Sequence, residues 1–212
     1  MKPIVILAGF STAGKSYYCS KIKEAFGDKI VTIDSDAEIS KTQGHAHIYD
    51  LFLKMGRDQA IKYIEAQEEL FLQQQLRPAD RPRLIAAGPF LLIRPSWEKV
   101  YHALKPYVIH IDVTAETVYE NLMKRQAKQK EQSDPDHALF GSWDAGVTTI
   151  YEGGKYIPVN KDQAIENIRE HLGRATGFYQ KFADIPFNSE ALRTDPVTSK
   201  ELLALITNKL GL

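Results

Sequence analysis

The residues best suited to chemistry lie close together near the start of the chain, in the stretch Gly9-Phe-Ser-Thr-Ala-Gly-Lys-Ser16. This stretch fits the pattern G-x-x-x-x-G-K-[ST] at every defined position. Glycine allows tight backbone turns that point successive N–H groups at an anion. In this pattern the lysine reaches the β- and γ-phosphates of a nucleotide, and the final hydroxyl binds Mg²⁺. We therefore expect a nucleoside polyphosphate here, contacted by Gly9, Ser11, Thr12, Ala13, Gly14, Lys15, Ser16 and Tyr17.

The surroundings of this loop agree with that chemistry. Residues 3–8 form an apolar run rich in β-branched side chains, which is typical of a buried strand, and residues 15–26 have a helical pattern that ends at Gly27. A helix that begins at the loop adds the positive end of its dipole to the anion site. The alternative is an ordinary glycine-rich turn between strand and helix. The full match in this context favours the phosphate loop.

Two acidic residues, Asp34 and Asp36, follow a second apolar run at residues 29–33. Residues two apart on a strand point the same way, so both carboxylates are expected to face the nucleotide site. Phosphoryl transfer needs charge neutralisation by a metal and a group that orients the attacking hydroxyl. Two carboxylates can divide these tasks. The alternative is a polar strand end at which Asp36 caps a helix that begins at Ala37.

The elements that must position these residues alternate along the chain. Strands are predicted at residues 3–8, 29–33, 83–87, 107–112 and 183–187, and helices at 15–26, 95–104, 115–130 and 198–210, with further helical segments between 37 and 76. The alternation predicts an α/β fold in which helices cover both faces of a parallel sheet. Glu65, Glu68 and Glu69 are expected on a solvated helix face. Residues 131–160 have no sustained period, and we expect a mobile covering segment there.

Length and composition favour a single domain over residues 1–212. The 27 basic and 27 acidic side chains give a formal charge of +0, so neither nucleic acid nor a membrane is expected as a partner. The first apolar run begins at Pro3 and leaves no room for a leader sequence, which favours a cytoplasmic protein. Cys19, the single cysteine, is expected to be a packed thiol.

These motifs resemble the shikimate kinase family, a branch of the P-loop kinases related to nucleoside-monophosphate kinases. The phosphate loop and the stretch around Asp34 and Asp36 are similar to the two most specific motifs of the family. Gly88 resembles the start of its glycine-rich acceptor loop, and Arg174 and Tyr179 resemble its late arginine–tyrosine stretch. The resemblance implies a three-layer P-loop kinase fold with a five-stranded parallel sheet in the order 2-3-1-4-5. It also implies ATP and Mg²⁺ as cofactors.

The resemblance further implies roles for individual residues. Asp34 would join Ser16 in the Mg²⁺ shell, and Asp36 would hold the acceptor hydroxyl as base or orienter. Residues 37–78 would form acceptor-binding helices, residues 124–160 a lid-like insert, and residues 188–196 the adenine-side loop. Arg174 would contact an anionic acceptor or the moving phosphoryl group, and Lys124 or Arg125 would neutralise the triphosphate. The expected set is Lys15, Asp36, Arg174 and Arg125 for catalysis, Asp36, Arg57, Gly88 and Arg174 for the acceptor, and Ser16 and Asp34 for the metal.

Two departures from the family pattern concern the acceptor. The family's arginine five residues beyond the glycine matched by Gly56 is Ile61 here, and the family's triple glycine is Gly88-Pro-Phe90. Loss of an arginine removes charge-assisted hydrogen bonds to a carboxylate, and Pro89 lacks a backbone N–H. We therefore expect transfer of the γ-phosphoryl group of ATP to a hydroxyl of a small molecule, with the identity of the acceptor left open.

Other functions stay open at this stage. A genuine shikimate kinase would have to bind its hydroxylated acid in the altered pocket, and a nucleoside or nucleotide kinase would use the insert for recognition. A nucleotide-binding interaction module without turnover is disfavoured by the intact phosphate loop and carboxylate pair. A GTPase is disfavoured because Asn160-Lys-Asp-Gln163 has its aspartate one residue too early for the guanine-binding N-K-x-D motif. We expect a monomer or a weak dimer.

Overall fold

The computed structural model describes residues 3–42, 44, 51, 54–74, 80–132, 145–152 and 155–212 of the chain. The strands are β1 (Ile4–Ala8), β2 (Val31–Asp34), β3 (Arg83–Ala86), β4 (Tyr107–Asp112), β5 (Thr149–Glu152), β6 (Lys155–Pro158) and β7 (Ile185–Asn188). The helices are α1 (Lys15–Phe26), α2 (Ser35–Lys41), α4 (Arg57–Gln74), α5 (Pro95–Leu104), α6 (Ala115–Gln132), α8 (Ala145–Thr148), α9 (Lys161–Phe182), α10 (Ser189–Thr194) and α11 (Pro196–Leu210), with short 3₁₀ turns η1 (Gly27–Lys29) and η2 (Leu91–Ile93). Within these ranges no helix is both long and apolar enough to cross a membrane.

Five strands form one sheet in the order β2-β3-β1-β4-β7, and each neighbouring pair is parallel. Because β7 is the last of these five strands along the chain, this is the predicted order 2-3-1-4-5. The register pairs Asp34 with Ala86 and Ala8 with His110. The carboxyl ends of β1, β2, β3 and β4 therefore lie along one edge of the sheet, where the candidate site residues follow them.

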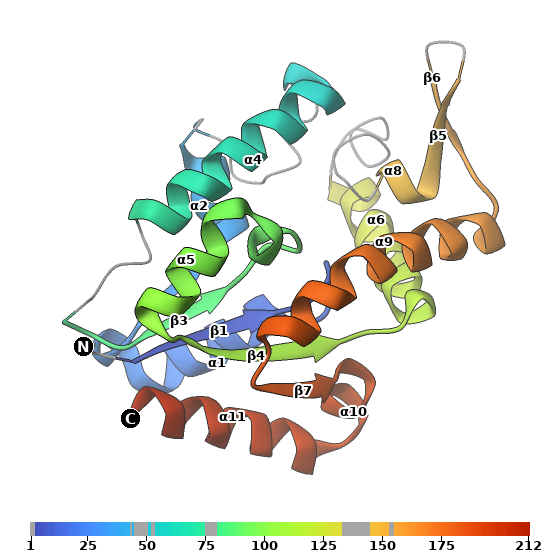
Figure 1. Cartoon of the computed structure of the whole chain (residues 1–212). Coiled ribbons are helices and arrows are strands. Elements are labelled where there is room, and N and C mark those ends of the chain that lie inside the picture. The colour runs from blue at the N-terminus through green and yellow to red at the C-terminus, as the bar shows by residue number, and fades with distance from the viewer. Residues whose placement is uncertain are drawn as a thin grey trace.

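Two apolar cores cover the two faces of this sheet, because successive residues of β1 point to opposite sides. Val5 and Leu7 pack with α1, α11 and part of α6. Ile4 and Ile6 pack with α4, α5 and the C-terminal half of α9. In Figure 1, α1 and α11 lie below the sheet, and α5 and α9 lie above it. Burial on both faces explains the unbroken apolar run of β1 and confirms the three-layer α/β fold.

The segment 131–160 contains more regular structure than the sequence predicted. Helix α6 extends to Gln132, and α8 leads into an antiparallel hairpin of β5 and β6 in which Ile150 pairs with Ile157. Residues 133–144 and 153–154 of the predicted covering segment lie outside the described residues. The sequence does carry a hairpin signal, since two glycines separate Thr-Ile-Tyr-Glu from Lys-Tyr-Ile-Pro. In Figure 1 this hairpin projects away from the sheet.

Helix α9, which has 22 residues, was not predicted from the sequence. Asn160 caps it, because its side-chain oxygen accepts a hydrogen bond from the N–H of Gln163 at 2.9 Å. The stretch that resembles a guanine motif therefore begins a helix and does not follow a strand of the sheet. Helical spacing is present in the buried residues, but Gly173 and Gly177 interrupt the pattern. The buried residues are Ala164, Ile165, Ile168, Ala175, Tyr179 and Phe182.

Candidate active site

The phosphate loop joins β1 to α1 and requires glycine at two positions. Gly9 has a φ of 146° and Gly14 a φ of 100°, in the region that other residues disfavour. A Cβ atom on Gly9 would also lie 2.5 Å from the carbonyl oxygen of Ile111 in β4. Among the described residues no side chain caps the first turn of α1. The main-chain N–H groups of that turn are therefore available to an anion.

Lys15 lies over this loop and is only 9% exposed. Its Nζ donates hydrogen bonds to the carbonyl oxygens of Gly9 and Phe10, over 2.7 and 2.8 Å. Burial lowers the pKa of Lys15 from 10.5 to about 8, and the charges of Asp36 and Asp34 oppose that shift. Both predicted carboxylates are thus within electrostatic reach of the lysine. A bound phosphate group would favour the charged form in the same way.

The two carboxylates do not lie on one strand, because β2 ends at Asp34 and α2 begins at Ser35. Asp34 Oδ1 accepts the backbone N–H groups of Asp36 and Ala37, over 3.1 and 3.2 Å. The cap of this helix is therefore Asp34, and the alternative that Asp36 caps it is wrong. The extended backbone of Asp34 places its carboxylate in front of the first turn. Its other oxygen, Oδ2, accepts a hydrogen bond from the Ser16 hydroxyl over 2.5 Å.

Asp36 lies in the first turn of α2, against the chain that follows β3. A Cβ atom added to Gly88 would overlap Oδ1 of Asp36 and would lie 3.3 Å from Oγ of Ser35. The N–H of Gly88 donates a hydrogen bond to the same Oγ over 2.7 Å. The structure thus brings together Asp36 and Gly88, two residues predicted for the acceptor side. Only glycine leaves room for the carboxylate in this position.

Glu68 of α4 is 2% exposed, so its predicted place on a solvated helix face is wrong. Its Oε2 lies 2.7 Å from Nε of Arg94, poorly aligned for a hydrogen bond, and NH1 of Arg94 lies 2.9 Å from Oε1 of Glu65. Burial raises the pKa of Glu68 to about 8, against the influence of Arg94. The burial of Glu68 could have been predicted from the sequence, because Glu68 lies four residues from both Ile64 and Leu72 on the apolar stripe of α4.

Tyr179 of α9 contacts the same region from the other side. Its hydroxyl donates a hydrogen bond to the carbonyl oxygen of Pro89 over 2.5 Å, and its ring centroid lies 4.7 Å from that of His110 in β4. Burial raises the pKa of Tyr179, and the charges of Glu68 and Asp36 raise it further. Tyr179, Glu68 and Asp36 therefore surround the segment that follows β3.

A cavity of about 490 Å³ lies on the other side of the phosphate loop, where the adenine-side loop was predicted. Asn121 Nδ2 donates to the carbonyl oxygen of Thr12 over 3.4 Å, and NH1 of Arg193 donates to Oδ1 of Asn121 over 3.0 Å. Tyr17 also lines the cavity and is 57% exposed. This volume is within the range of small-molecule sites. The lining residues are Thr12, Ala13, Gly14, Tyr17, Tyr18, Asn121, Ser189, Leu192, Arg193, Pro196 and Ser199.

Solved structures share the fold of this protein over the whole chain. The shikimate kinase from Bacteroides thetaiotaomicron superposes with a TM-score of 0.64 at 14% identity, over 100% of both chains. The shikimate kinase from Acinetobacter baumannii in complex with shikimate gives a TM-score of 0.63 at 18% identity, over 99% of this chain and 96% of that one. The chain has the shikimate kinase-like P-loop kinase fold. The tunicamycin resistance protein from Deinococcus radiodurans gives a TM-score of 0.52 at 12% identity, over 100% and 97% of the two chains.

The whole-sequence comparisons found no corresponding match. The sequence matches no protein-family model, and no curated protein sequence matches it either. At 12–18% identity, similar structures establish the P-loop kinase fold and leave the acceptor to be argued from the side chains.

The remaining predicted residues occupy different places in the P-loop kinase fold. Arg125, on α6, is near enough for its charge to lower the pKa of Lys15, after the larger effect of burial. Arg174 is exposed on α9 beside the buried Ala175, and it forms no ion pair with another described residue. Arg57 begins α4, and its side chain lies outside the described part of the structure. The roles of these three arginines stay predictions.

The phosphate site of this P-loop kinase fold offers a metal few protein ligands. The hydroxyl of Ser16 and the carboxylate of Asp34 are hard oxygen donors of the kind that Mg²⁺ prefers. No group of three or more His, Cys, Asp or Glu side chains in the described ranges could hold a metal ion. Mg²⁺ commonly takes its other ligands from substrate phosphates and water. The donor set therefore fits a metal that arrives with a nucleotide.

Proposed function

We propose that this protein is an ATP-dependent phosphotransferase that moves the γ-phosphoryl group to a hydroxyl of a small-molecule acceptor. One observation carries the proposal. Asp34 and Asp36 both influence the buried Lys15, while one is bonded to Ser16 and the other lies against Gly88. The first contact suits a metal-bound triphosphate, and the second suits an acceptor. The shikimate kinases that share the fold support this class of reaction.

The nucleotide side of the site would hold the charge of the triphosphate. The loop N–H groups and Lys15 bind the β- and γ-phosphates, and Arg125 adds positive charge from α6. Ser16 and Asp34 would hold Mg²⁺, which would supply positive charge against the triphosphate. The base enters the cavity between the phosphate loop and α10, beside Tyr17. The cavity volume and lining support that placement.

The acceptor side would perform the proton transfer. Asp36 orients the acceptor hydroxyl and accepts its proton while the acceptor oxygen forms a bond to the γ-phosphorus. The bond from that phosphorus to the bridging oxygen breaks, and ADP leaves. Arg174 contacts the acceptor or the transferred group. Residues 124–160 close over the site, because an open site would hydrolyse ATP.

Genuine shikimate phosphorylation is the second candidate, favoured by one observation. The Acinetobacter baumannii shikimate kinase, which shares the fold, is in complex with shikimate. Against it stands Ile61, at the position where the family resemblance implies an arginine. Ile61 packs against an apolar cluster of Ile39, Leu51 and Ala60. We therefore keep the broader proposal, a kinase of small-molecule alcohols.

The test measures ADP release from Mg²⁺-ATP with a panel of hydroxy acids, sugars, nucleosides and uncharged alcohols. We expect turnover with at least one class, and its loss in Lys15→Ala. Asp36→Asn should still bind ATP but lose about 10²- to 10⁴-fold in transfer, the usual contribution of a general base. Lys23→Ala is the matched control, since Lys23 lies on the same helix and pairs with Asp28 at the surface. Unchanged transfer by Asp36→Asn would contradict the proposal.

A further inference from the structure

The phosphate loop is held from outside by side chains of two other elements, and the role we infer for them rests on the proposed function. Asn121 of α6 donates from Nδ2 to the carbonyl oxygen of Thr12 over 3.4 Å. Ser189, the first residue of α10, is 2% exposed and donates from Oγ to the carbonyl oxygen of Ala13 over 3.4 Å. Two consecutive carbonyl groups of the loop are thus bound by residues that follow them by 109 and 176 positions along the chain.

Thr12 needs such support, because its backbone conformation is unfavourable for its residue type. Its φ is 67°, and a β-branched residue is strained in that left-handed region. Its Oγ1 is buried and has no hydrogen-bond partner among the described residues, so the side chain of Thr12 does not stabilise the turn itself. Backbone strain of this kind persists only where the surrounding structure holds it in place. Asn121 and Ser189 supply contacts of that kind at Thr12 and at the residue after it.

The orientation of these carbonyl groups bears on whether the loop can bind an anion. Successive N–H groups must point into the loop, and a carbonyl oxygen turned inward would repel a phosphate group. Lys15 binds the first two carbonyl oxygens of the loop, and Asn121 and Ser189 bind the fourth and the fifth. Four of the five carbonyl groups that precede Gly14 therefore have a donor within the protein.

Arg193 of α10 fixes which way the amide of Asn121 points. Its NH1 donates to Oδ1 of Asn121 over 3.0 Å, and its Nε donates to the carbonyl oxygen of Ser189 over 3.3 Å. A guanidinium group can only donate hydrogen bonds, so Oδ1 must face it and Nδ2 is directed to the carbonyl group of Thr12. Arg193 therefore contacts both residues that bind the loop.

We propose that Asn121 and Ser189 are positioning residues that hold the phosphate loop ready for the triphosphate, and that Arg193 acts through Asn121. The loop then has its binding geometry before the nucleotide arrives, so less ordering is needed when the nucleotide binds. Loss of either donor should weaken the binding of phosphate groups whether or not a base is attached to them. That distinguishes positioning from a direct contact with the base, since all three residues also line the cavity beside the loop.

The experiment compares ATP with inorganic tripolyphosphate, which has phosphate groups but no base, by calorimetric titration in the presence of Mg²⁺. We expect Asn121→Ala and Ser189→Ala each to weaken both ligands by a similar factor of about fivefold, the effect of losing one ordinary hydrogen bond. Thr207→Ala is the control, since the hydroxyl of Thr207 donates to the carbonyl oxygen of Leu203 within α11.

The possible outcomes separate this inference from the proposed function. A loss of ATP affinity alone would overturn the inference, because the mutated residue would then bind the base. Unchanged affinity for both ligands in either variant would overturn the role of that residue and leave the kinase proposal intact. A wild-type protein that binds neither ligand would overturn the proposed function and the inference with it.

Two combined variants test the positioning role further. Glycine adopts a left-handed φ without strain, so Thr12→Gly should restore the affinity of Asn121→Ala for tripolyphosphate to within about twofold of the wild type. Arg193→Met should weaken tripolyphosphate binding in the wild type but have little further effect in Asn121→Ala, as expected of a residue that acts through another. Absence of rescue by glycine would overturn the role assigned to Asn121. A full effect of Arg193→Met in the Asn121→Ala background would overturn the role assigned to Arg193.

Discussion

The hydroxyl of Ser16 donates a hydrogen bond to Oδ2 of Asp34 over 2.5 Å and thereby joins the start of α1 to the end of β2. The other oxygen of the same carboxylate caps α2. One side chain thus has two functions that can be separated by mutation. Capping needs an oxygen acceptor, whereas metal binding needs the negative charge.

Asp34→Asn should separate these functions. Asparagine caps helices about as well as aspartate, so the free energy of unfolding should change by less than about 0.5 kcal/mol. The Mg²⁺-dependent part of ATP affinity should fall about tenfold, because the site loses its carboxylate. Asp34→Ala loses the cap as well and should cost about 1 kcal/mol of stability. Urea unfolding and ATP titration with and without Mg²⁺ measure both effects. Unchanged Mg²⁺ dependence in Asp34→Asn would exclude this residue from the metal shell.

Gly88→Ala should damage transfer without damaging nucleotide binding. The new methyl group would overlap Oδ1 of Asp36, so the carboxylate must move away from its present position. We expect a loss of at least tenfold in kcat, because misplacing a catalytic group by about 1 Å can cost a hundredfold. The ATP dissociation constant should stay within twofold. Steady-state kinetics and ATP titration report the two quantities.

Gly177→Ala is the matched control for that substitution. Within the described part of the chain nothing lies within 4 Å of a Cβ atom at Gly177, which is in the middle of α9. Alanine there should raise stability by about 0.5–1 kcal/mol, since glycine is a poor helix former. A similar loss of kcat in both variants would show that the effect at Gly88 is not due to Asp36.

The parts of the fold that depend on local pattern were predictable from the sequence. β1, β4, α1 and α5 have the bounds expected from apolar runs, a cap or a proline, to within one residue. The hairpin of β5 and β6 and helix α9 also have recognisable sequence patterns. The hairpin lies in a stretch of polar composition, and Gly173 and Gly177 interrupt the helical pattern of α9. Sheet order could not come from pattern alone and was implied by the family resemblance.

Only part of the candidate site could be predicted from the sequence. The pairing of Ser16 with Asp34 follows from the phosphate-loop motif and the carboxyl edge of the sheet. The burial of Glu68 depends on Arg94, which lies 26 residues further along the chain and on another element. No period within α4 specifies that contact. Asp34 and Asp36 were expected to point the same way along a strand, but Asp34 caps α2, so the strand ends at Asp34 and Asp36 lies in the first turn of the helix.

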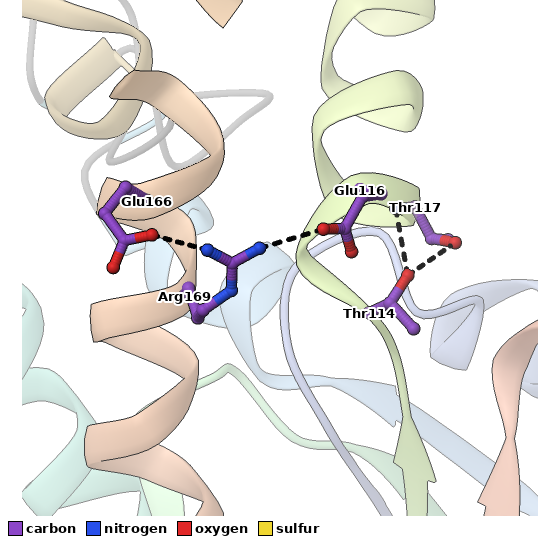
Figure 2. A network of polar contacts seen from close by, with 5 residues as sticks. All are labelled: Thr114, Glu116, Thr117, Glu166 and Arg169. Carbon is purple, nitrogen blue, oxygen red and sulfur yellow. Dashed lines mark hydrogen bonds and ion pairs between the residues drawn. The ribbon is translucent and has the colours of Figure 1, made fainter. Parts of the chain in front are cut away.

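An exposed ion pair links the two helices that flank the predicted lid. NH2 of Arg169 on α9 contacts Oε1 of Glu116 on α6 at 2.9 Å, and NH1 contacts Glu166 (Figure 2). All three side chains are more than half exposed, so water and salt screen the attraction. Arg169→Ala should lower Tm by no more than about 2 °C. A double-mutant cycle with Glu116→Ala, repeated at high salt, should give a coupling that disappears as salt rises.

A similar pair serves as the control for that measurement. Lys181 on α9 lies 2.9 Å from Glu98 on α5, and both side chains are exposed to a comparable degree. It is distant in sequence from residues 124–160. If the two helices around the insert move during turnover, only Arg169→Ala should change kcat. Equal kinetic effects of Arg169→Ala and Lys181→Ala would contradict a special role for the α6–α9 contact.

Because its pKa is lowered, Lys15 should make the folded protein more stable as pH rises above about 8. Its pKa is lowered from 10.5 to about 8 by burial, so between these values the unfolded chain binds more protons than the folded protein. Stability attributable to this group therefore rises as pH rises from about 8 towards 10.5. Lys15→Met removes the buried charge and should be more stable than the wild type at pH 7, by of the order of 2–3 kcal/mol. That advantage should shrink as pH approaches 10.

Urea unfolding of both proteins at pH 7, 8, 9 and 9.5 measures this difference, with Lys21→Met as control for an exposed lysine of the same helix. The pH dependence of ATP binding tests the protonation state of Lys15 independently. Because phosphate groups favour the charged lysine, ATP affinity in the wild type should weaken as pH rises above about 8, with proton uptake on binding. Lys15→Met should bind weakly at every pH in that range. A stability difference that stays constant from pH 7 to 9.5 would show that Lys15 keeps its proton in the folded protein.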